Sequence, residues 1–153
     1  NVRVWSCLAT VGDHLDYPVR LKKTVGRMGT YLQAYGDLMV NTNQWDPKVL
    51  GNFRRHKLIK NFNGSLDQKA TTSELEQVAE LIPQTWLANA ANGTPANCVA
   101  AIQHQFELGV DGVILHGASP DELAPVIAEY RRQRSPGSFH HLPANPALPP
   151  FKT

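Results

Sequence analysis

The sequence lacks the features of membrane and secreted proteins. It has no apolar run long enough to cross a membrane, no amino-terminal secretory signal, and only two cysteines, Cys7 and Cys98. A chain with this cysteine usage fits a reducing compartment, so we expect a cytoplasmic protein with two free thiols. A disulfide between the two cysteines is the alternative.

The sequence also lacks a large excess of positive or negative charge. The 15 Lys and Arg residues nearly balance the 13 Asp and Glu residues, which leaves a formal net charge of +2. Attraction to nucleic acid or to an anionic membrane needs a large field of one sign. We therefore predict neither a nucleic-acid nor a membrane partner. The 42% of hydrophobic residues is typical of one soluble globular domain.

Short catalytic motifs are absent as well. The sequence contains no G-x-S-x-G nucleophile elbow, no glycine-rich phosphate loop, no zinc-ligand spacing and no paired-cysteine motif. The adjacent histidines at 140 and 141 are too few to indicate a metal site. No catalytic residue is assigned and no metal is predicted, so function has to be sought in the positions of residues.

Two segments have the character of buried strands. The first, Val2–Val11, is rich in β-branched and aromatic residues and stops at Gly12-Asp13. The second, Val110–Leu115, is a short apolar run followed by His116-Gly117, as expected of a strand in a parallel sheet. These are the two strands that the sequence predicts.

Most of the remaining chain indicates helices. An apolar stripe at helical spacing begins after Pro18 and comprises Leu21, Val25, Met28, Leu32, Tyr35 and Met39. The basic residues off this stripe are Arg20, Lys22, Lys23 and Arg27. We interpret them as a solvated helix face, and an anion or phosphate contact is the alternative.

Capping signals predict where further helices start. The residues that carry these signals are Asp46-Pro47, Thr71 with Glu74, Thr94-Pro95 and Ser119-Pro120. The second helix should run to Pro83, and the third should end at Gly109. Pro125 should bend the fourth helix or delay its start. Residues 57–69 are ambiguous, and residues 135–153 predict a proline-rich extended tail.

Together these segments resemble a known enzyme family. The order Gly93-Thr94-Pro95-Ala96, a helix, and then Leu108–Gly117 is similar to the closing segment of luciferase-like monooxygenases and their coenzyme F-420-dependent relatives. The blocks Leu21–Met28 and Tyr31–Leu38 resemble the F-420-dependent oxidoreductase branch. The resemblance covers most of residues 2–132.

The resemblance implies a fold and a cofactor. The fold is α/β, the carboxy-terminal part of a (β/α)8 TIM barrel that is helix-rich with few strands. Residues 1–134 would form its last β/α units, with a helical insertion around 41–90. The cofactor would be F-420 or FMN, used for hydride transfer to a small organic substrate or for its monooxygenation. In this family most cofactor contacts come from earlier strands, which would precede Asn1.

Active sites of β/α barrels lie at the carboxyl ends of the strands and in the loops that follow. This rule selects His116 and Gly117 as cofactor-binding residues, together with Trp5 on the first strand. It selects Asp13 and His14 as substrate-binding residues. A histidine or tryptophan at such a position is as often a packing or hydrogen-bonding residue, and that alternative stays open.

The number of strands limits the activity of the chain. The chain begins at Asn1-Val2 without a methionine and enters a strand at once, so we expect a fragment of a longer enzyme. Two strands cannot close a barrel, and exposed strand edges favour pairing with another chain. We therefore expect the fragment to be inactive alone and to form a homo-oligomer. The alternative function is a non-catalytic luciferase-like remnant that acts as a dimerising interaction module.

Overall fold

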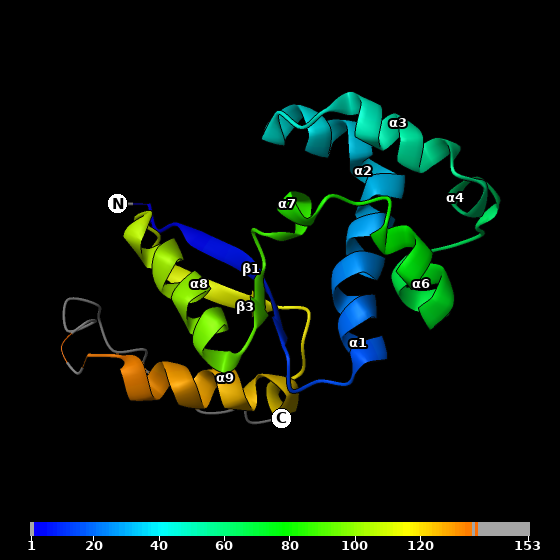
Figure 1. The fold of residues 1–153 in the computed structure, drawn as a ribbon. Coiled ribbons are helices and arrows are strands. Elements are labelled where there is room, and N and C mark those ends of the chain that lie inside the picture. The colour runs from blue at the N-terminus through cyan, green and yellow to red at the C-terminus, as the bar shows by residue number, and fades with distance from the viewer. Residues whose placement is uncertain (1, 136, 138–153) are drawn as a thin grey trace, which may run out of the picture.

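The computed structural model describes residues 2–135 and 137 (Figure 1). They form an α/β fold that is mostly helical, with a three-stranded parallel sheet that is not closed into a barrel. The strands are β1 (Trp5–Gly12), β2 (Ala91–Gly93) and β3 (Gly112–His116), in the order β2-β1-β3. None of the described helices is long and apolar enough to span a membrane.

The sheet corrects two expectations from the sequence. β1 begins at Trp5 rather than at Val2, and residues 91–93, directly before the predicted cap at Thr94, form a third strand. β2 pairs with the last residues of β1, from Thr10↔Ala91 to Gly12↔Gly93. β3 pairs with the first part of β1, from Trp5↔Gly112 to Ala9↔His116. β1 is therefore the central strand, and the strands do not follow one another in chain order.

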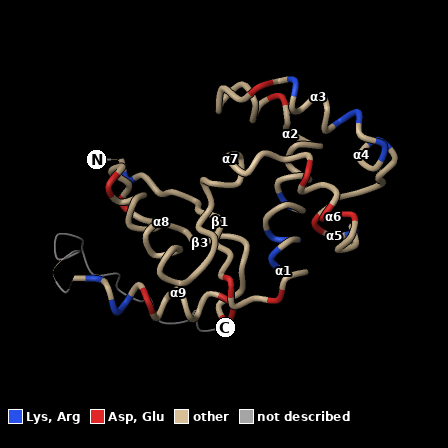
Figure 2. The backbone as a smooth tube through the Cα atoms, in the orientation of Figure 1, with Lys and Arg blue, Asp and Glu red and all other residues tan. Residues whose placement is uncertain are grey.

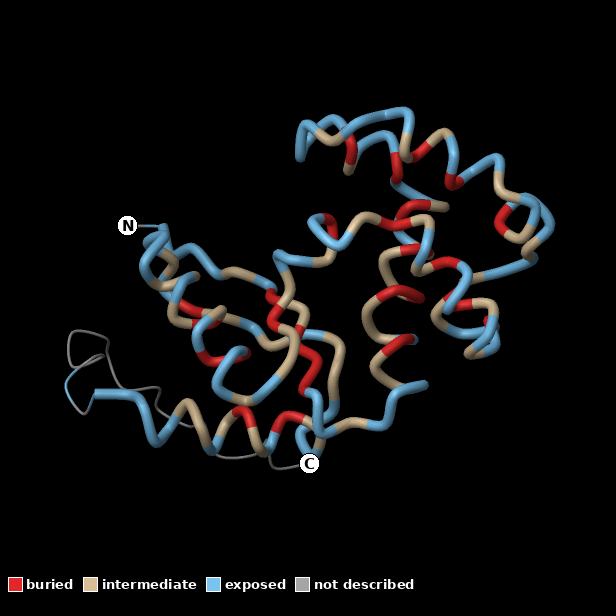
Figure 3. The backbone as a smooth tube through the Cα atoms, in the orientation of Figure 1, coloured by how far each residue is buried: buried red, intermediate tan, exposed pale blue. Residues whose placement is uncertain are grey.

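One face of the sheet is covered by the helices α8 (Pro95–Glu107) and α9 (Pro120–Gln133) (Figure 1). The residues buried between them and the sheet are Leu8, Ala91, Cys98, Val99, Ile102 and Val126. The opposite face of the sheet carries Trp5, Cys7 and Ile114, which are exposed. Val11, also on this face, is only 3% exposed, so the face is exposed toward the amino end of β1 and covered at the carboxyl end. We call it the open face; a parallel sheet usually buries both faces. Figure 3 colours the backbone by burial.

The rest of the chain forms a second packed cluster of helices. Its elements are α1 (Tyr17–Leu21), the π-helical turn η1 (Lys22–Gly26), α2 (Arg27–Asn43), α3 (Pro47–Arg55), α4 (Lys57–Asn61), α5 (Leu66–Lys69), α6 (Thr72–Ala79) and α7 (Gln84–Leu87). Its most deeply buried side chains include Leu32, Phe53, Leu66, Leu75 and Val78. The predicted insertion, 41–90, thus contains helices, and they pack with residues 17–43 into one core.

The predicted single helix along the Leu21–Met39 stripe is interrupted. Residues Lys22–Gly26 form a π-helical turn, and Tyr35 has non-helical angles (φ −130°, ψ 19°) inside α2. The π-helical turn packs closely against α5 at Gly26, where an added Cβ would lie 3.0 Å from Cα of Asp67. Amphipathic spacing predicts which residues form the buried stripe, but it does not predict such a local change of helical pitch.

The predicted caps are confirmed. Asp46 and Thr94 cap α3 and α8, while Thr71 with Glu74 and Ser119 with Glu122 form capping boxes. α9 starts at Pro120 and continues through Pro125, so the delayed start does not occur.

Other boundaries differ from the predictions. α6 ends at Ala79, short of the predicted end at Pro83, and two short helices occupy the ambiguous region 57–69. The predicted tail lies outside the described residues, apart from residues 135 and 137.

Candidate functional site

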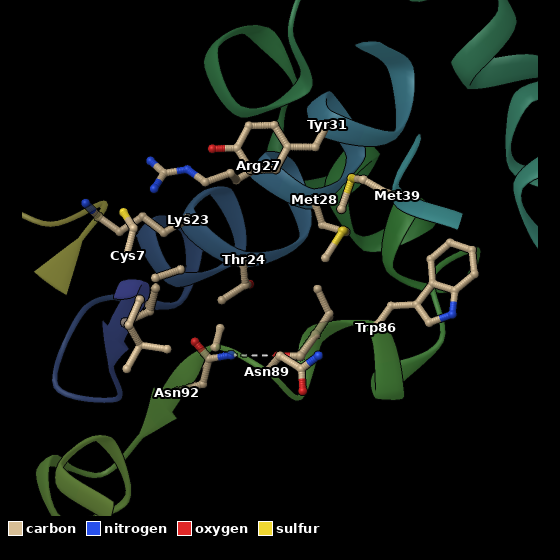
Figure 4. A pocket seen from close by; sticks show the side chains of 15 residues that line it. Cys7, Lys23, Thr24, Arg27, Met28, Tyr31, Met39, Trp86, Asn89 and Asn92 are labelled. Atoms are coloured by element: carbon tan, nitrogen blue, oxygen red, sulfur yellow. Dashed lines mark hydrogen bonds between the residues drawn. The ribbon is translucent and has the colours of Figure 1, made fainter. Parts of the chain in front are cut away.

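A cavity of about 240 Å³ lies between the open face of the sheet and the helix formed by η1 and α2 (Figure 4). Three residues at alternate positions of β1, Cys7, Ala9 and Val11, form part of its floor. The wall from η1 and α2 consists of Lys23, Thr24, Arg27, Met28, Tyr31 and Met39. The remaining lining comes from Leu8 and from Trp86, Leu87, Asn89, Ala90 and Asn92.

The helical wall contains the π-helical turn. Lys23 and Thr24 belong to this turn and both line the cavity. π-Helical turns are rare and occur frequently at functional sites, because the widened backbone changes where side chains point. The position of η1 against the cavity therefore marks this wall as a candidate site.

Lys23 connects the π-helical turn to the loop after β3. Its Nζ donates to the carbonyl oxygen of Gly117 at 2.9 Å and lies 3.0 Å from Oε2 of Glu122. The side chain of Lys23 is only 19% exposed. The prediction of a solvated basic face is therefore wrong for Lys23, which is paired and largely buried.

Glu122 is the common partner of several elements. Its carboxylate accepts from the backbone N–H of Ser119 and from Lys23, and these two hydrogen bonds, in that order, lower the pKa of Glu122. Its carbonyl oxygen accepts from Nε2 of His14 at 2.9 Å. Glu122 thus fixes the loop after β1, the π-helical turn and the start of α9 relative to one another.

Arg27 lies beside Gly117. A Cβ at Gly117 would collide with Nη1 of Arg27, and the φ of +87° at Gly117 is one that residues with side chains rarely adopt. Among the described residues Arg27 has no hydrogen bond or ion pair. We call Lys23 and Arg27 the cationic rim of the cavity; Figure 2 marks the basic positions along this helix.

The structure brings together some of the residues that the sequence selected. Asp13 and His14 follow β1, His116 is the last residue of β3, and Gly117 follows it. All four therefore lie toward the carboxyl ends of these parallel strands. The N–H of Asp13 donates to Gly93 at 2.8 Å. His14 and Gly117 belong to the contacts of Glu122 and Lys23 described above.

Trp5 lies apart from this group. It packs over Gly112 at the amino end of β1 and is 58% exposed. Neither Trp5 nor the four residues at the carboxyl ends line the cavity. Their roles in cofactor or substrate binding stay predictions.

The sequence did not indicate that the cavity-lining residues form one site. Lys23 and Arg27 belong to the basic cluster, for which an anion contact was the alternative interpretation. Gly117, which follows β3, has a φ of +87°, a conformation that favours glycine. No pattern in the sequence indicated that Trp86 belongs to a site. It is 5% exposed, stacks on Trp45 with ring centroids 4.2 Å apart, and lies near Met39 at one end of the cavity (Figure 4).

A second cavity, of about 770 Å³, adjoins the first. Val11, Thr24, Leu87, Ala90 and Asn92 line both. The additional lining residues are Tyr17, Arg20, Leu21, Val25, Ala79, Gln84, Ala88 and Gly93. Within residues 2–135, no cluster of three or more His, Cys, Asp or Glu side chains could hold a metal ion. The histidines at 140 and 141 lie outside the described residues.

Comparisons with protein-family models, with curated proteins and with solved structures find no match to this chain.

Proposed function

We propose that this chain is the carboxy-terminal portion of a luciferase-like oxidoreductase that uses F-420 or FMN. The reaction is hydride transfer to a small organic substrate or its monooxygenation. The observation that carries the proposal is the apolar cavity at the open face of the sheet, bordered by Lys23 and Arg27. The resemblance of the sequence blocks is its second support.

The arrangement of β1, α8, β3 and α9 is compatible with part of a barrel. β1 and β3 are parallel neighbours, and the helices that follow in the chain cover the same face of the sheet. In a (β/α)8 barrel the helices form the outer ring and the other sheet face lines the interior. The order β2-β1-β3 departs from a barrel, but β2 has three residues and pairs only with the end of β1.

The lining suits a planar apolar group that carries an anion. Val11, Met28 and Trp86 offer apolar surface, while the cationic rim lies at another part of the same cavity. Small-molecule sites usually enclose about 300–1,000 Å³. The first cavity of about 240 Å³ is below this range, so the proposed site includes part of the adjoining cavity.

In this proposal the chain binds and orients the cofactor, whose ring supplies the redox chemistry. Arg27 would hold the phosphate of FMN or F-420, because its guanidinium has no other partner among the described residues. Lys23 would stay paired with Glu122, so the net positive charge at the rim would come from Arg27. The apolar wall would exclude water from the ring.

The test is direct titration of the chain with FMN and, separately, with F-420, followed by cofactor fluorescence. We expect saturable binding of one cofactor and a loss of about tenfold or more in Arg27→Gln, because a charge-assisted hydrogen bond is removed. Arg131→Gln is the matched control, since Arg131 is exposed on α9. Absence of binding by both cofactors, or equal loss in both variants, contradicts the proposal.

The exposed sheet face supports the second candidate, a dimerising interaction module without catalysis. Trp5 is 58% and Ile114 50% exposed, and β3 is an edge strand. This function predicts concentration-dependent association in analytical ultracentrifugation without cofactor binding. Ile114→Glu should abolish association, whereas Leu38→Glu, at an exposed position of α2, should not. A chain that stays monomeric excludes this candidate.

A further inference from the structure

The second cavity contains two polar atoms that lack partners. Nε of Arg20 and Oδ1 of Asn92 are buried and make no hydrogen bond with any of the residues that the structure describes. Both residues line this cavity. Burying a polar group without a partner is unfavourable, so two such groups at one cavity point to a missing polar ligand.

The position of Arg20 is determined by the helix to which it belongs and by an adjacent aromatic ring. It belongs to α1, and its guanidinium carbon lies 6.0 Å from the centre of the Tyr17 ring. Its carbonyl oxygen accepts from Thr24 in η1 at 2.8 Å. Burial raises the pKa of Tyr17, and the nearby carboxylate of Glu76 raises it further. No carboxylate forms an ion pair with Arg20 in the described part of the chain.

Asn92 lies at the junction of the two cavities. Its Nδ2 donates to the carbonyl oxygen of Leu87 at 3.3 Å, which fixes the orientation of the amide and leaves Oδ1 as a free acceptor (Figure 4). The guanidinium of Arg20 only donates, and Oδ1 of Asn92 only accepts. The two groups therefore differ in the ligand atoms that they require.

We propose that the second cavity binds an organic acid that carries both a carboxylate and a hydroxyl group. The carboxylate accepts hydrogen bonds from Arg20, and the hydroxyl donates to Oδ1 of Asn92. Apolar side chains between them, Leu21, Val25 and Leu87, contact the carbon skeleton. This inference rests on the proposed function in one respect: the hydroxyl end lies at the cavity assigned to the cofactor, which makes the hydroxy acid the substrate class.

The polarity of the ligand can be tested without the cofactor. The probes are benzoate, its neutral analogue benzamide, and the three monohydroxybenzoates, each titrated into the chain and followed by NMR. We expect benzoate to bind about tenfold or more tightly than benzamide, since the charge-assisted hydrogen bond is lost in the amide. One hydroxybenzoate should bind more tightly than benzoate, because it satisfies Asn92.

Variants locate the site. Arg20→Gln should weaken benzoate binding about tenfold or more, and Arg20→Lys should have an intermediate effect, because it keeps the charge and loses the planar fork. Lys22→Gln is the matched control, since Lys22 is an exposed cation two residues away. The Nε–H resonance of Arg20 should shift with benzoate in the unchanged protein, which keeps the test valid if Arg20→Gln does not fold.

Each outcome has a defined meaning. Equal binding of benzoate and benzamide, equal loss in Arg20→Gln and Lys22→Gln, or an unchanged Nε–H resonance overturns the inference. If hydroxybenzoate binds through Arg20 while neither FMN nor F-420 binds, the carboxylate site stands and the oxidoreductase proposal fails. If a cofactor binds and no carboxylate does, the oxidoreductase proposal stands and this inference fails.

Discussion

Nζ of Lys23 lies 3.0 Å from Oε2 of Glu122, although the two residues are 99 positions apart in the chain. The contact joins the π-helical turn to the first turn of α9 and places the cationic rim against the loop after β3. The contact is partly buried, with 19% and 26% of the two side chains exposed. It therefore links the stability of the fold to the geometry of the candidate site.

Substitution of Glu122 should reveal this link through pH. The folded pKa of Glu122 is lowered, so its stabilising effect is present above the usual value of 4.5 and disappears as the pH falls through the folded pKa. Near neutral pH, Glu122→Gln should reduce the free energy of unfolding by about 1 kcal/mol. In acid, once the pH is below the folded pKa, the difference from the unchanged protein should be much smaller.

Urea unfolding followed by tryptophan fluorescence measures both values. Glu80→Gln is the control, because Glu80 is exposed at the end of α6. A deficit in Glu122→Gln of the same size at both pH values would show that its charge is not involved.

Gly117 and Gly109 provide a matched pair of substitutions. Both have positive φ, +87° and +93°, so alanine should cost each about 1 kcal/mol of backbone strain. At Gly109 a Cβ would meet nothing within 4 Å, whereas at Gly117 it would collide with Arg27. Because the guanidinium is the end of a flexible side chain and can move aside, the two variants should have similar melting temperatures, and only Gly117→Ala should weaken binding of the cofactor. Unchanged cofactor binding in Gly117→Ala would argue against the position of Arg27.

The stacked pair Trp45 and Trp86 should have a spectroscopic signature. Their planes lie 9° apart with centroids at 4.2 Å, a geometry that allows exciton coupling between the indoles. We expect a couplet in the far-ultraviolet circular dichroism that is lost in Trp45→Phe and in Trp86→Phe. Trp5→Phe should keep it, because Trp5 is on β1, outside the pair. Persistence of the couplet in either of the first two variants would contradict the stacking.

The two thiols should differ in reactivity. Cys7 is exposed and lines the first cavity, whereas Cys98 is buried, and burial with the nearby Asp13 carboxylate raises the pKa of the Cys98 thiol. A thiol-specific chromogenic reagent should therefore modify one cysteine in the folded protein and both after denaturation. Cys7→Ser should remove the rapid phase, and a ligand that fills the first cavity should slow it. Rapid modification of both thiols in the folded state would contradict the buried position of Cys98.

The starts of several helices were determined by short segments of sequence. Ser119 and Glu122 are three residues apart, as are Thr71 and Glu74, and each pair forms its capping box. Such contacts depend on backbone geometry within one helical turn, so they can be predicted without the rest of the fold. The apolar runs that became β1 and β3 were predicted for the same reason, because hydrophobic character is a property of the segment itself.

The candidate site was decided by the tertiary structure. Lys23 reaches Glu122 across 99 residues and His14 reaches the same residue across 108, so no local pattern distinguishes these side chains from a solvated face. β2 forms because residues 91–93 meet the end of β1, not because of their own strand propensity. Sequence thus determined where elements start and which faces are apolar. Packing between distant elements decided which polar groups are buried, paired or left facing a cavity.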